Sequence, residues 1–307
     1  MTEPSRPALR WHGGKWRLAP WIISHFPAHR TYVEPFGGAA SVLIRKPRAY
    51  AEIYNDLDDE VVDLFRVLRD PERAALLEQL LRLTPFARGE FRGAYEPTDD
   101  VIERCRRLVI RSFMGFGSNA HASAEKGHRS TGFRASSSRS GTTPALDWAN
   151  YPTAMTALVE RMQGVVIESR PAIEVMAQHD RPETLHYVDP PYMHQTRSPS
   201  NKYDLKFRMY RHEMTDDQHA DLLEYLRTVQ GMVVLSGYPA PLYDDMLFDW
   251  RRVEKETFAD GARQRLEVLW INPRAASALE RTSAAHAQGS GTPLFGQAGG
   301  AACSISL

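Results

Sequence analysis

Short apolar segments alternate with longer amphipathic segments through most of this chain, and this alternation limits the folds open to it. Residues 31–36 and 50–56 have the pattern of strands, and residues 58–70 have apolar positions at helical spacing. After residue 150 the expected elements are a helix at 152–163, a strand at 165–169, a helix at 172–180, a strand at 185–189, a helix that Thr215 caps, a strand at 231–238 and a helix at 241–248. Repeated strand–helix units predict an α/β fold whose open, mostly parallel sheet has helices on both faces.

Three departures from the alternation divide the chain. Between residues 71 and 149 it lapses: helical stretches at 72–83 and 99–111 lead into a run rich in Gly, Ser and Arg. Residues 250–259 and 265–273 are expected to form two strands with no helix between them, which predicts an antiparallel edge. Beyond Pro273 the chain is rich in Ala, Ser and Gly, and we expect it to be mobile. The expected organisation is one discontinuous α/β domain (1–70 and 150–274), an inserted subdomain (71–149) and a mobile tail (275–307).

Composition excludes several classes of protein. The 307 residues are 42% hydrophobic and 25% charged, as in globular proteins. No run approaches the roughly 18 apolar residues of a membrane span, and the N-terminus lacks the apolar centre of a secretory signal. The two cysteines, Cys105 and Cys303, have neither metal-site nor disulfide-framework spacing. We therefore expect a cytoplasmic, monomeric protein with no membrane partner and no metal.

Two motifs follow the first two expected strands. Residues 33–41 (VEPFGGAAS) place two glycines between a strand and a helix start, at the strand end where open α/β sheets bind ligands. A tight turn between a strand and a helix needs glycine in any case, so a purely structural role for these glycines stays an alternative. Asp56, in the stretch NDLDDE, follows the next strand at the distance from which an acid accepts hydrogen bonds from ribose hydroxyls. Helix capping by Asn55 or Asp56 is the competing interpretation.

Residues 10–16 (RWHGGKW) suggest a phosphate-binding loop but do not fit one. The pattern G-x-x-x-x-G-K-[ST] fails, because Trp16 follows Lys15 and no strand precedes the glycines. A nucleotide hydrolase is therefore not expected. Lys15 can instead neutralise a carboxylate on a small ligand, and Trp11 offers an aromatic wall.

The stretch 189–192 (DPPY) ends the strand before it in an unusual way, since proline cannot continue a sheet interior. It suits an exocyclic amino group on a flat base. Asp189 and the carbonyl of Pro190 can each accept one amino hydrogen, and Tyr192 can stack on the ring. Pro190 and Pro191 hold these acceptors at a fixed separation, which is preorganisation rather than general base strength. A plain strand-ending turn explains the prolines but not the four residues together.

Basic residues are concentrated in two segments although the formal net charge is zero. Residues 101–146 carry eight Lys or Arg and only two acids, and residues 193–214 are also basic and aromatic. We expect phosphate contacts from both segments, with a solvated surface as the alternative. The residues predicted to make these contacts are Arg111, Asn119, Arg134, Arg139, Arg197, Lys202 and Arg208.

These motifs, in this order, resemble the Dam-like (D12 class) DNA adenine N6-methyltransferases, especially those of phages and prophages. The resemblance covers residues 10 to 273. It implies a Rossmann-like, doubly wound, seven-stranded sheet with a final antiparallel hairpin, a helical target-recognition insert, S-adenosylmethionine as cofactor and double-stranded DNA as partner. It assigns cofactor binding to Trp11, Gly14, Lys15, Glu34, Phe36, Gly38, Asp56 and Asp189, and catalysis to Asp189, Pro190, Pro191 and Tyr192.

Two departures from the family pattern are visible. The F-x-G-x-G turn ends in Ala40, and the insert lacks the R-x-N-x-x-G-x-F-N-x-P-x-G pattern of members that methylate GATC. The resemblance implies in-line transfer of the methyl group to N6 of a flipped-out adenine. No covalent nucleophile is needed, and no cysteine stands beside a proline as cytosine C5 methylation requires. Cytosine N4 methylation, another substrate such as RNA or a protein amide, and a catalytically silent DNA-binding relative are the alternatives.

Overall fold

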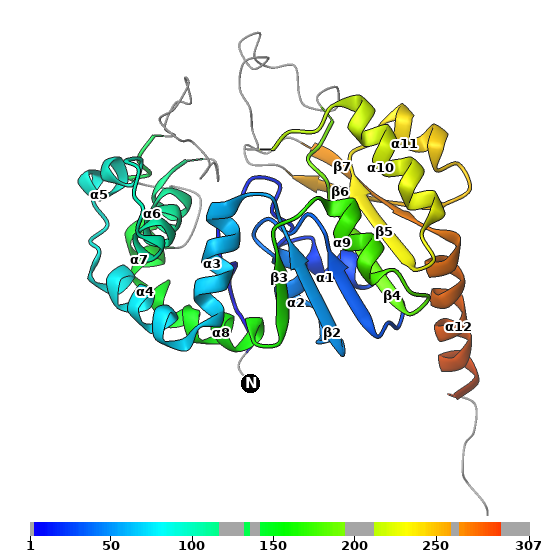
Figure 1. Cartoon of the computed structure of the whole chain (residues 1–307), viewed down its shortest axis with the longest axis horizontal. Coiled ribbons are helices and arrows are strands. Elements are labelled where there is room, and N and C mark those ends of the chain that lie inside the picture. Colours follow the sequence, from blue (N-terminus) through cyan, green and yellow to red (C-terminus); the bar gives the residue numbers. More distant parts are fainter. Residues whose placement is uncertain (1–2, 117–131, 136–141, 194–211, 259–263, 290–307) are drawn as a thin grey trace, which may run out of the picture.

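The computed structural model describes residues 3–116, 132–135, 142–193, 212–258 and 264–289. Within these residues a seven-stranded sheet forms the centre of the molecule (Figure 1). Its strands, in spatial order, are β3 (Val165–Glu168), β2 (Ala51–Asn55), β1 (Thr31–Glu34), β4 (Thr184–Val188), β5 (Met232–Gly237), β7 (Gln264–Ile271) and β6 (Arg251–Phe258). The first five are parallel, and β7 is antiparallel to both neighbours. The predicted doubly wound sheet with an antiparallel hairpin is confirmed.

Helices cover both faces of the sheet because successive strand residues point to opposite sides. On β5, Val234 belongs to one buried cluster, whereas Val233 and Leu235 belong to another. The first cluster includes side chains of α1 (Ala19–Ile23), α2 (Ser41–Arg45), α3 (Asp59–Arg69), α8 (Met155–Met162) and α12 (Pro273–Gly289). The second includes side chains of α9 (Ala172–His179), α10 (Asp216–Thr228) and α11 (Pro241–Met246).

Local capping chemistry explains where two of these helices begin. The Thr215 hydroxyl accepts from the Gln218 N–H, and the Gln218 side chain accepts from the Thr215 N–H, so the predicted capping box at the start of α10 is confirmed. At α3 the N-cap is Asp58, which accepts from the Glu60 N–H. The alternative role of Asn55 and Asp56 as the cap is therefore wrong.

The segment predicted as an inserted subdomain contains four helices, which lie together on the side of the molecule next to α3 (Figure 1). They are α4 (Pro71–Leu83), α5 (Arg88–Gly93), α6 (Val101–Met114) and α7 (Pro144–Ala149), and the short 3₁₀ helix η1 (Pro152–Ala154) follows. Buried side chains such as Leu77 and Leu108 belong to the same cluster as Tyr32 and Leu185 of the sheet. The inserted helices thus extend the main core instead of forming a separate one.

The prediction of a mobile tail from residue 275 is wrong for residues 275–289, which continue α12. Asn272 caps this helix: its Oδ1 accepts from the N–H groups of Ala275 and Val233, and its Nδ2 donates to the Gly231 carbonyl. Pro273 then occupies the first helical position, which suits proline. Ala275 is buried against the sheet. Neither α12 nor any other helix of the described ranges is long and apolar enough to cross a membrane.

The strand order reverses between β1 and β4, since β1 leads outward to β2 and β4 leads outward to β5. Ligands of open α/β sheets bind at such a switch point, beyond the carboxyl ends of the strands. The glycine turn follows β1, and the stretch 189–192 follows β4. The topology therefore brings these two motifs to one edge of the sheet.

Candidate functional site

The turn after β1 requires glycine for two different reasons. A Cβ atom on Gly37 would lie 2.2 Å from Cε2 of Tyr54, so only hydrogen fits there. Gly38 has a φ of +45°, in the left-handed region that glycine adopts without strain. Ala40 also has a positive φ, of +52°, although the family pattern has glycine at this position. Gly37, which the sequence motif did not single out, is thus the residue that lets the chain pass over the Tyr54 ring.

Trp11 and Asp56 lie on either side of Gly38. Asp56 Oδ2 accepts from the Gly38 N–H at 2.7 Å, and the Trp11 indole nitrogen lies 3.0 Å from where a Cβ of Gly38 would be. The Trp11 carbonyl accepts from the Gly14 N–H, which closes the turn that leads to Lys15. An aromatic ring, a glycine backbone and a carboxylate therefore meet at the ends of β1 and β2. This combination fits a nucleoside-bearing cofactor.

Glu34, which was predicted to line the cofactor site, is buried among residues that support the glycine turn. Its Oε2 accepts from the Tyr32 hydroxyl at 2.6 Å and from the Leu43 N–H of α2 at 2.9 Å. Burial, assisted by the nearby Asp189 carboxylate, raises the pKa of Glu34 to about 8. The side chain holds the first turn of α2 against β1, and its contact with a cofactor stays a prediction. Phe36 is partly buried against the second cluster.

Lys15 and the 189–192 stretch form one polar cluster. The Lys15 ammonium lies 2.8 Å from both Asp189 oxygens, 2.5 Å from the Tyr192 hydroxyl and 3.1 Å from the Gly13 carbonyl. These contacts join Lys15 to two residues that are 174 and 177 positions further along the chain. Pro190 is buried, Pro191 is half-buried, and no described residue donates a hydrogen bond to the Pro190 carbonyl. Asp189 and this carbonyl are thus two acceptors at the end of β4.

Four partners of this cluster were not predicted from the sequence. Ser236 of β5 donates to Asp189 Oδ1 at 2.7 Å, and Tyr238 stacks on Tyr192 with ring centroids 4.1 Å apart. Arg265 donates to the Tyr238 hydroxyl. Glu267 of β7 accepts from the Tyr192 hydroxyl at 3.1 Å and lies 3.4 Å from the Lys15 ammonium. An acid within the apolar strand sequence RLEVLWI was the available signal for Glu267; nothing local marked the others.

Burial and charge set the protonation of this cluster. Burial lowers the pKa of Lys15, but Asp189 and Glu267 outweigh it and hold that pKa well above its ordinary value. Burial raises the pKa of Glu267, although Lys15 opposes the rise. The cluster therefore keeps a charged ammonium between two carboxylates. In the described part of the chain, no group of three or more His, Cys, Asp or Glu side chains is arranged to hold a metal ion.

The comparison with known families agrees with this geometry. A family model described as D12 class N6 adenine-specific DNA methyltransferase matches residues 11–257, which include the glycine turn and the 189–192 stretch. The chain belongs to this family. Its similarity to two DNA adenine methylases is more local: that of Vibrio cholerae serotype O1 is 26% identical over 120 residues, or 37% of this chain and 43% of the relative, and that of Serratia marcescens is 33% identical over 67 residues, or 22% and 24%. The chain spans less than half the length of these curated relatives.

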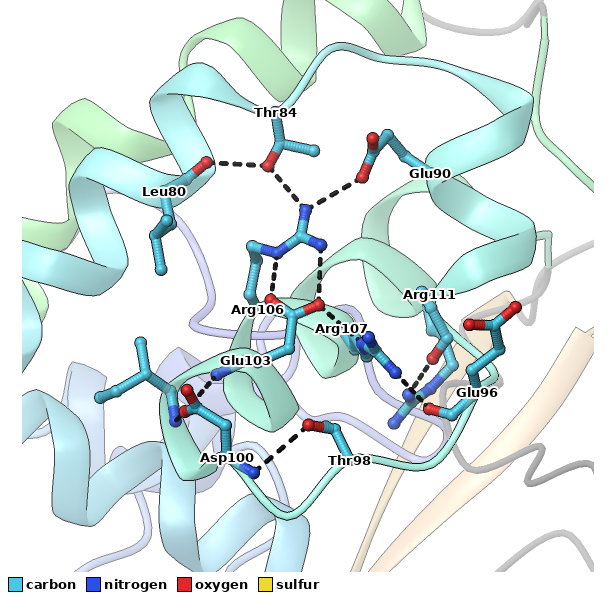
Figure 2. A network of polar contacts seen from close by, with 12 residues as sticks. Leu80, Thr84, Glu90, Glu96, Thr98, Asp100, Glu103, Arg106, Arg107 and Arg111 are labelled. Atoms are coloured by element: carbon cyan, nitrogen blue, oxygen red, sulfur yellow. Dashed lines mark hydrogen bonds and ion pairs between the residues drawn. The ribbon is translucent and has the colours of Figure 1, made fainter.

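In this D12 methyltransferase family member, the arginines of α6 bind protein acids. Arg104 pairs with Asp63 and Arg107 with Glu103. Figure 2 shows Arg106 bound to Glu103, Glu90 and Thr84. The prediction that Arg111 contacts DNA phosphates is wrong, because its side chain is 7% exposed, pairs with Glu60 of α3 at 2.7 Å and donates to the Ala94 carbonyl. These arginines attach α6 to its neighbours, which leaves less of the segment's positive charge for a ligand.

Arg134 is the predicted DNA contact that the structure describes outside α6. Its N–H donates to the Met114 carbonyl, beside a short bridge between Gly115 and Phe133. Its side chain is half-buried, and Nη1 has no hydrogen-bond partner among the described residues. The other predicted contacts, Asn119, Arg139, Arg197, Lys202 and Arg208, lie outside the described residues. Arg134 therefore remains a candidate.

Proposed function

We propose that this protein transfers a methyl group from S-adenosylmethionine to the exocyclic amino group of adenine in double-stranded DNA. The observation that carries the proposal is the pair of acceptors at the end of β4. Asp189 is 16% exposed at its side chain, and the Pro190 carbonyl receives no hydrogen bond from a described residue. Together they match the two hydrogens of an amino group. Membership of the D12 family supports adenine as the base.

Asp189 and Pro190 act by orienting the amino group. When both amino hydrogens are bound, the nitrogen lone pair is drawn out of conjugation with the ring and directed at the methyl group. Pro190 and Pro191 restrict the backbone, so the acceptors need little reorganisation during the reaction. Tyr192 provides the adjacent aromatic surface, and Tyr238 stacks on it. These side chains position the substrate and supply no covalent nucleophile.

The cofactor site we propose lies around Gly38. S-adenosylmethionine supplies the methyl group when it is bound. Asp56 accepts hydrogen bonds from the ribose hydroxyls, Trp11 forms an aromatic wall, and Gly38 lets this wall lie against the backbone of the turn. Gly14 and Lys15 shape the side of the site that receives the amino-acid end, and Glu34 and Phe36 support the turn from behind. The contact of Trp11 with Gly38 and of Asp56 with the Gly38 N–H supports this grouping.

Double-stranded DNA is the partner we propose, bound by a monomer in the cytoplasm. Flipping an adenine out of the helix costs a few kcal/mol, which contacts to the phosphates offset. Arg134 is the described side chain that supports this step: its Nη1 is buried and has no hydrogen-bond partner among the described residues, so the side chain must turn outward to meet a phosphate. The missing GATC-type pattern in the insert favours another recognition sequence or a relaxed one.

One assay tests the reaction. The protein is incubated with duplex DNA and S-adenosylmethionine labelled in its methyl group, and the digested nucleosides are identified by mass spectrometry. We expect N6-methyladenine from the wild type and none from Asp189→Ala, whose cofactor binding is weakened but measurable. N4-methylcytosine would instead identify the related amino-methyltransferase reaction. Absence of incorporation into DNA would favour a silent relative or, if RNA or protein is labelled, another substrate.

A further inference from the structure

Glu267 is a buried carboxylate to which the proposed reaction gives no part. Its side chain is 3% exposed on β7, between apolar neighbours of the strand. Removing a carboxylate from water costs several kcal/mol unless partners compensate it. Its partners are the Tyr192 hydroxyl and the Lys15 ammonium, both members of the amino-binding cluster. The position of Glu267 is therefore tied to the site and not to the packing of the sheet.

Asp189 has two competing tasks if it binds a substrate amino group. In the present state Oδ1 accepts from both Lys15 and Ser236, and Oδ2 also lies 2.8 Å from the Lys15 ammonium. An incoming amino group must compete with this ammonium for the carboxylate. Withdrawal of Lys15 from one Asp189 oxygen would open a hydrogen-bonding site for the substrate amino group there.

Glu267 is placed to receive the ammonium that withdraws. The Lys15 nitrogen is 3.4 Å from Glu267 Oε1, and a movement of about 0.6 Å brings it to the usual distance of a charge-assisted hydrogen bond. The two carboxylates also differ in access, since the Asp189 side chain is 16% exposed and that of Glu267 is 3% exposed. A substrate can reach Asp189, whereas Glu267 stays behind Lys15.

We propose that Glu267 is a positioning residue that takes over the Lys15 ammonium when a substrate amino group binds Asp189. The inference rests on the proposed amino-methylation. Transfer of Lys15 from one carboxylate to the other keeps the ammonium paired throughout, so capture of the substrate does not leave the buried Lys15 charge alone. The Tyr192 hydroxyl, which accepts from Lys15 and donates to Glu267, stays fixed during the exchange. Glu267 thus frees Asp189 and keeps the aromatic surface in place.

The test uses Glu267→Gln, which keeps an oxygen that accepts from Tyr192 but removes the negative charge. We expect kcat for adenine methylation to fall about 10- to 100-fold, as when a reacting group is misplaced. The affinity for S-adenosylmethionine and the unfolding midpoint should stay close to wild type. The exposed Glu256→Gln on the neighbouring strand β6 is the matched control and should keep the wild-type kcat.

A pH profile separates this role from a structural one. Glu267 faces Lys15, Asp189 and Tyr192, and burial raises its pKa, so its protonation contributes to the acid side of the wild-type kcat profile. The kcat profile of Glu267→Gln should lack that contribution and should therefore be flatter on the acid side. An unchanged kcat, or a lowered kcat with an unchanged profile, overturns the proposal.

A second variant covers failure of the first to fold. Glu267→Asp keeps the charge but moves it away from Lys15 by about one bond length, so we expect a lower kcat at unchanged cofactor affinity; wild-type kcat in this variant overturns the proposal. The wild type serves as the reference for the reaction itself. If the wild type methylates adenine and the variants have the same kcat, only the proposed role of Glu267 is refuted. If it methylates no adenine, the proposed function fails and the role of Glu267 fails with it.

Discussion

The buried imidazole of His186 makes the stability of the fold depend on pH. His186 lies in the middle of β4, three residues before Asp189, with Val33 and Val233 as its neighbours on the adjacent strands. It is fully buried, and neither ring nitrogen has a hydrogen-bond partner among the described residues. Asp180 Oδ1 is 3.6 Å from Nε2, and both Asp180 oxygens already accept from the N–H groups of Gln230 and Gly231. The folded chain therefore favours the neutral imidazole.

Burial lowers the pKa of His186 from 6.5 to about 4; Asp180 opposes this shift and His179 adds to it. Between these two values the unfolded chain binds a proton at this position that the folded chain does not. Stability contributed by the neutral imidazole is therefore present above the unfolded pKa and is lost as the pH falls toward the folded pKa. Linkage gives a loss on the order of 3 kcal/mol between neutral pH and the folded pKa.

Urea unfolding of wild type and His186→Val, at neutral and at acid pH, measures this contribution. Valine suits a central strand and leaves the two Asp180 hydrogen bonds intact. The variant should lose about 3 kcal/mol less than the wild type on acidification. The exposed His212→Val is the matched control and should lose as much as the wild type. Equal losses in wild type and His186→Val would refute the assignment of this stability to the buried imidazole.

Three further predictions concern the turn, α12 and the proposed DNA contact. Gly37→Ala drives a methyl group into the Tyr54 ring, so the free energy of unfolding should fall by about 1–3 kcal/mol in thermal unfolding. Calorimetry should also show weaker binding of S-adenosylmethionine. In the control Gly89→Ala the added methyl group meets nothing within 4 Å, and binding should be unchanged. Asn272→Ala removes the α12 cap and three hydrogen bonds, so urea unfolding should show a loss of about 2 kcal/mol or more, and a wild-type midpoint would contradict the capping role. Arg134→Gln should reduce the slope of log affinity for DNA against log salt by about 1, whereas Arg104→Gln, whose partner is Asp63, should not; equal slopes would remove Arg134 from the interface.

The sequence by itself determined the order of the strands, most of the helices between them and the chemistry at the strand ends. The spacing of apolar residues, the capping residues and the Asp-Pro-Pro-Tyr ending are local features, and each affects only residues close to it in the sequence. The alternation therefore predicted a parallel sheet, and the position of 189–192 after a strand predicted where Asp189 would lie. Asn272 and Pro273 are also local signals for the start of α12. The helix was not predicted because the residues after Pro273 have little apolar periodicity, although Ala275 packs in the core.

Only the tertiary structure decided which charges meet. The arginines of α6 form a basic run in the sequence, yet Asp63 and Glu60 of α3 and Glu90 of α5 neutralise much of it. Glu267 is separated from Lys15 by most of the chain and meets it because β7 lies next to β5 and near β4. Charge pairing depends on distance in space and on exclusion of water, and neither is a property of neighbouring residues in the chain.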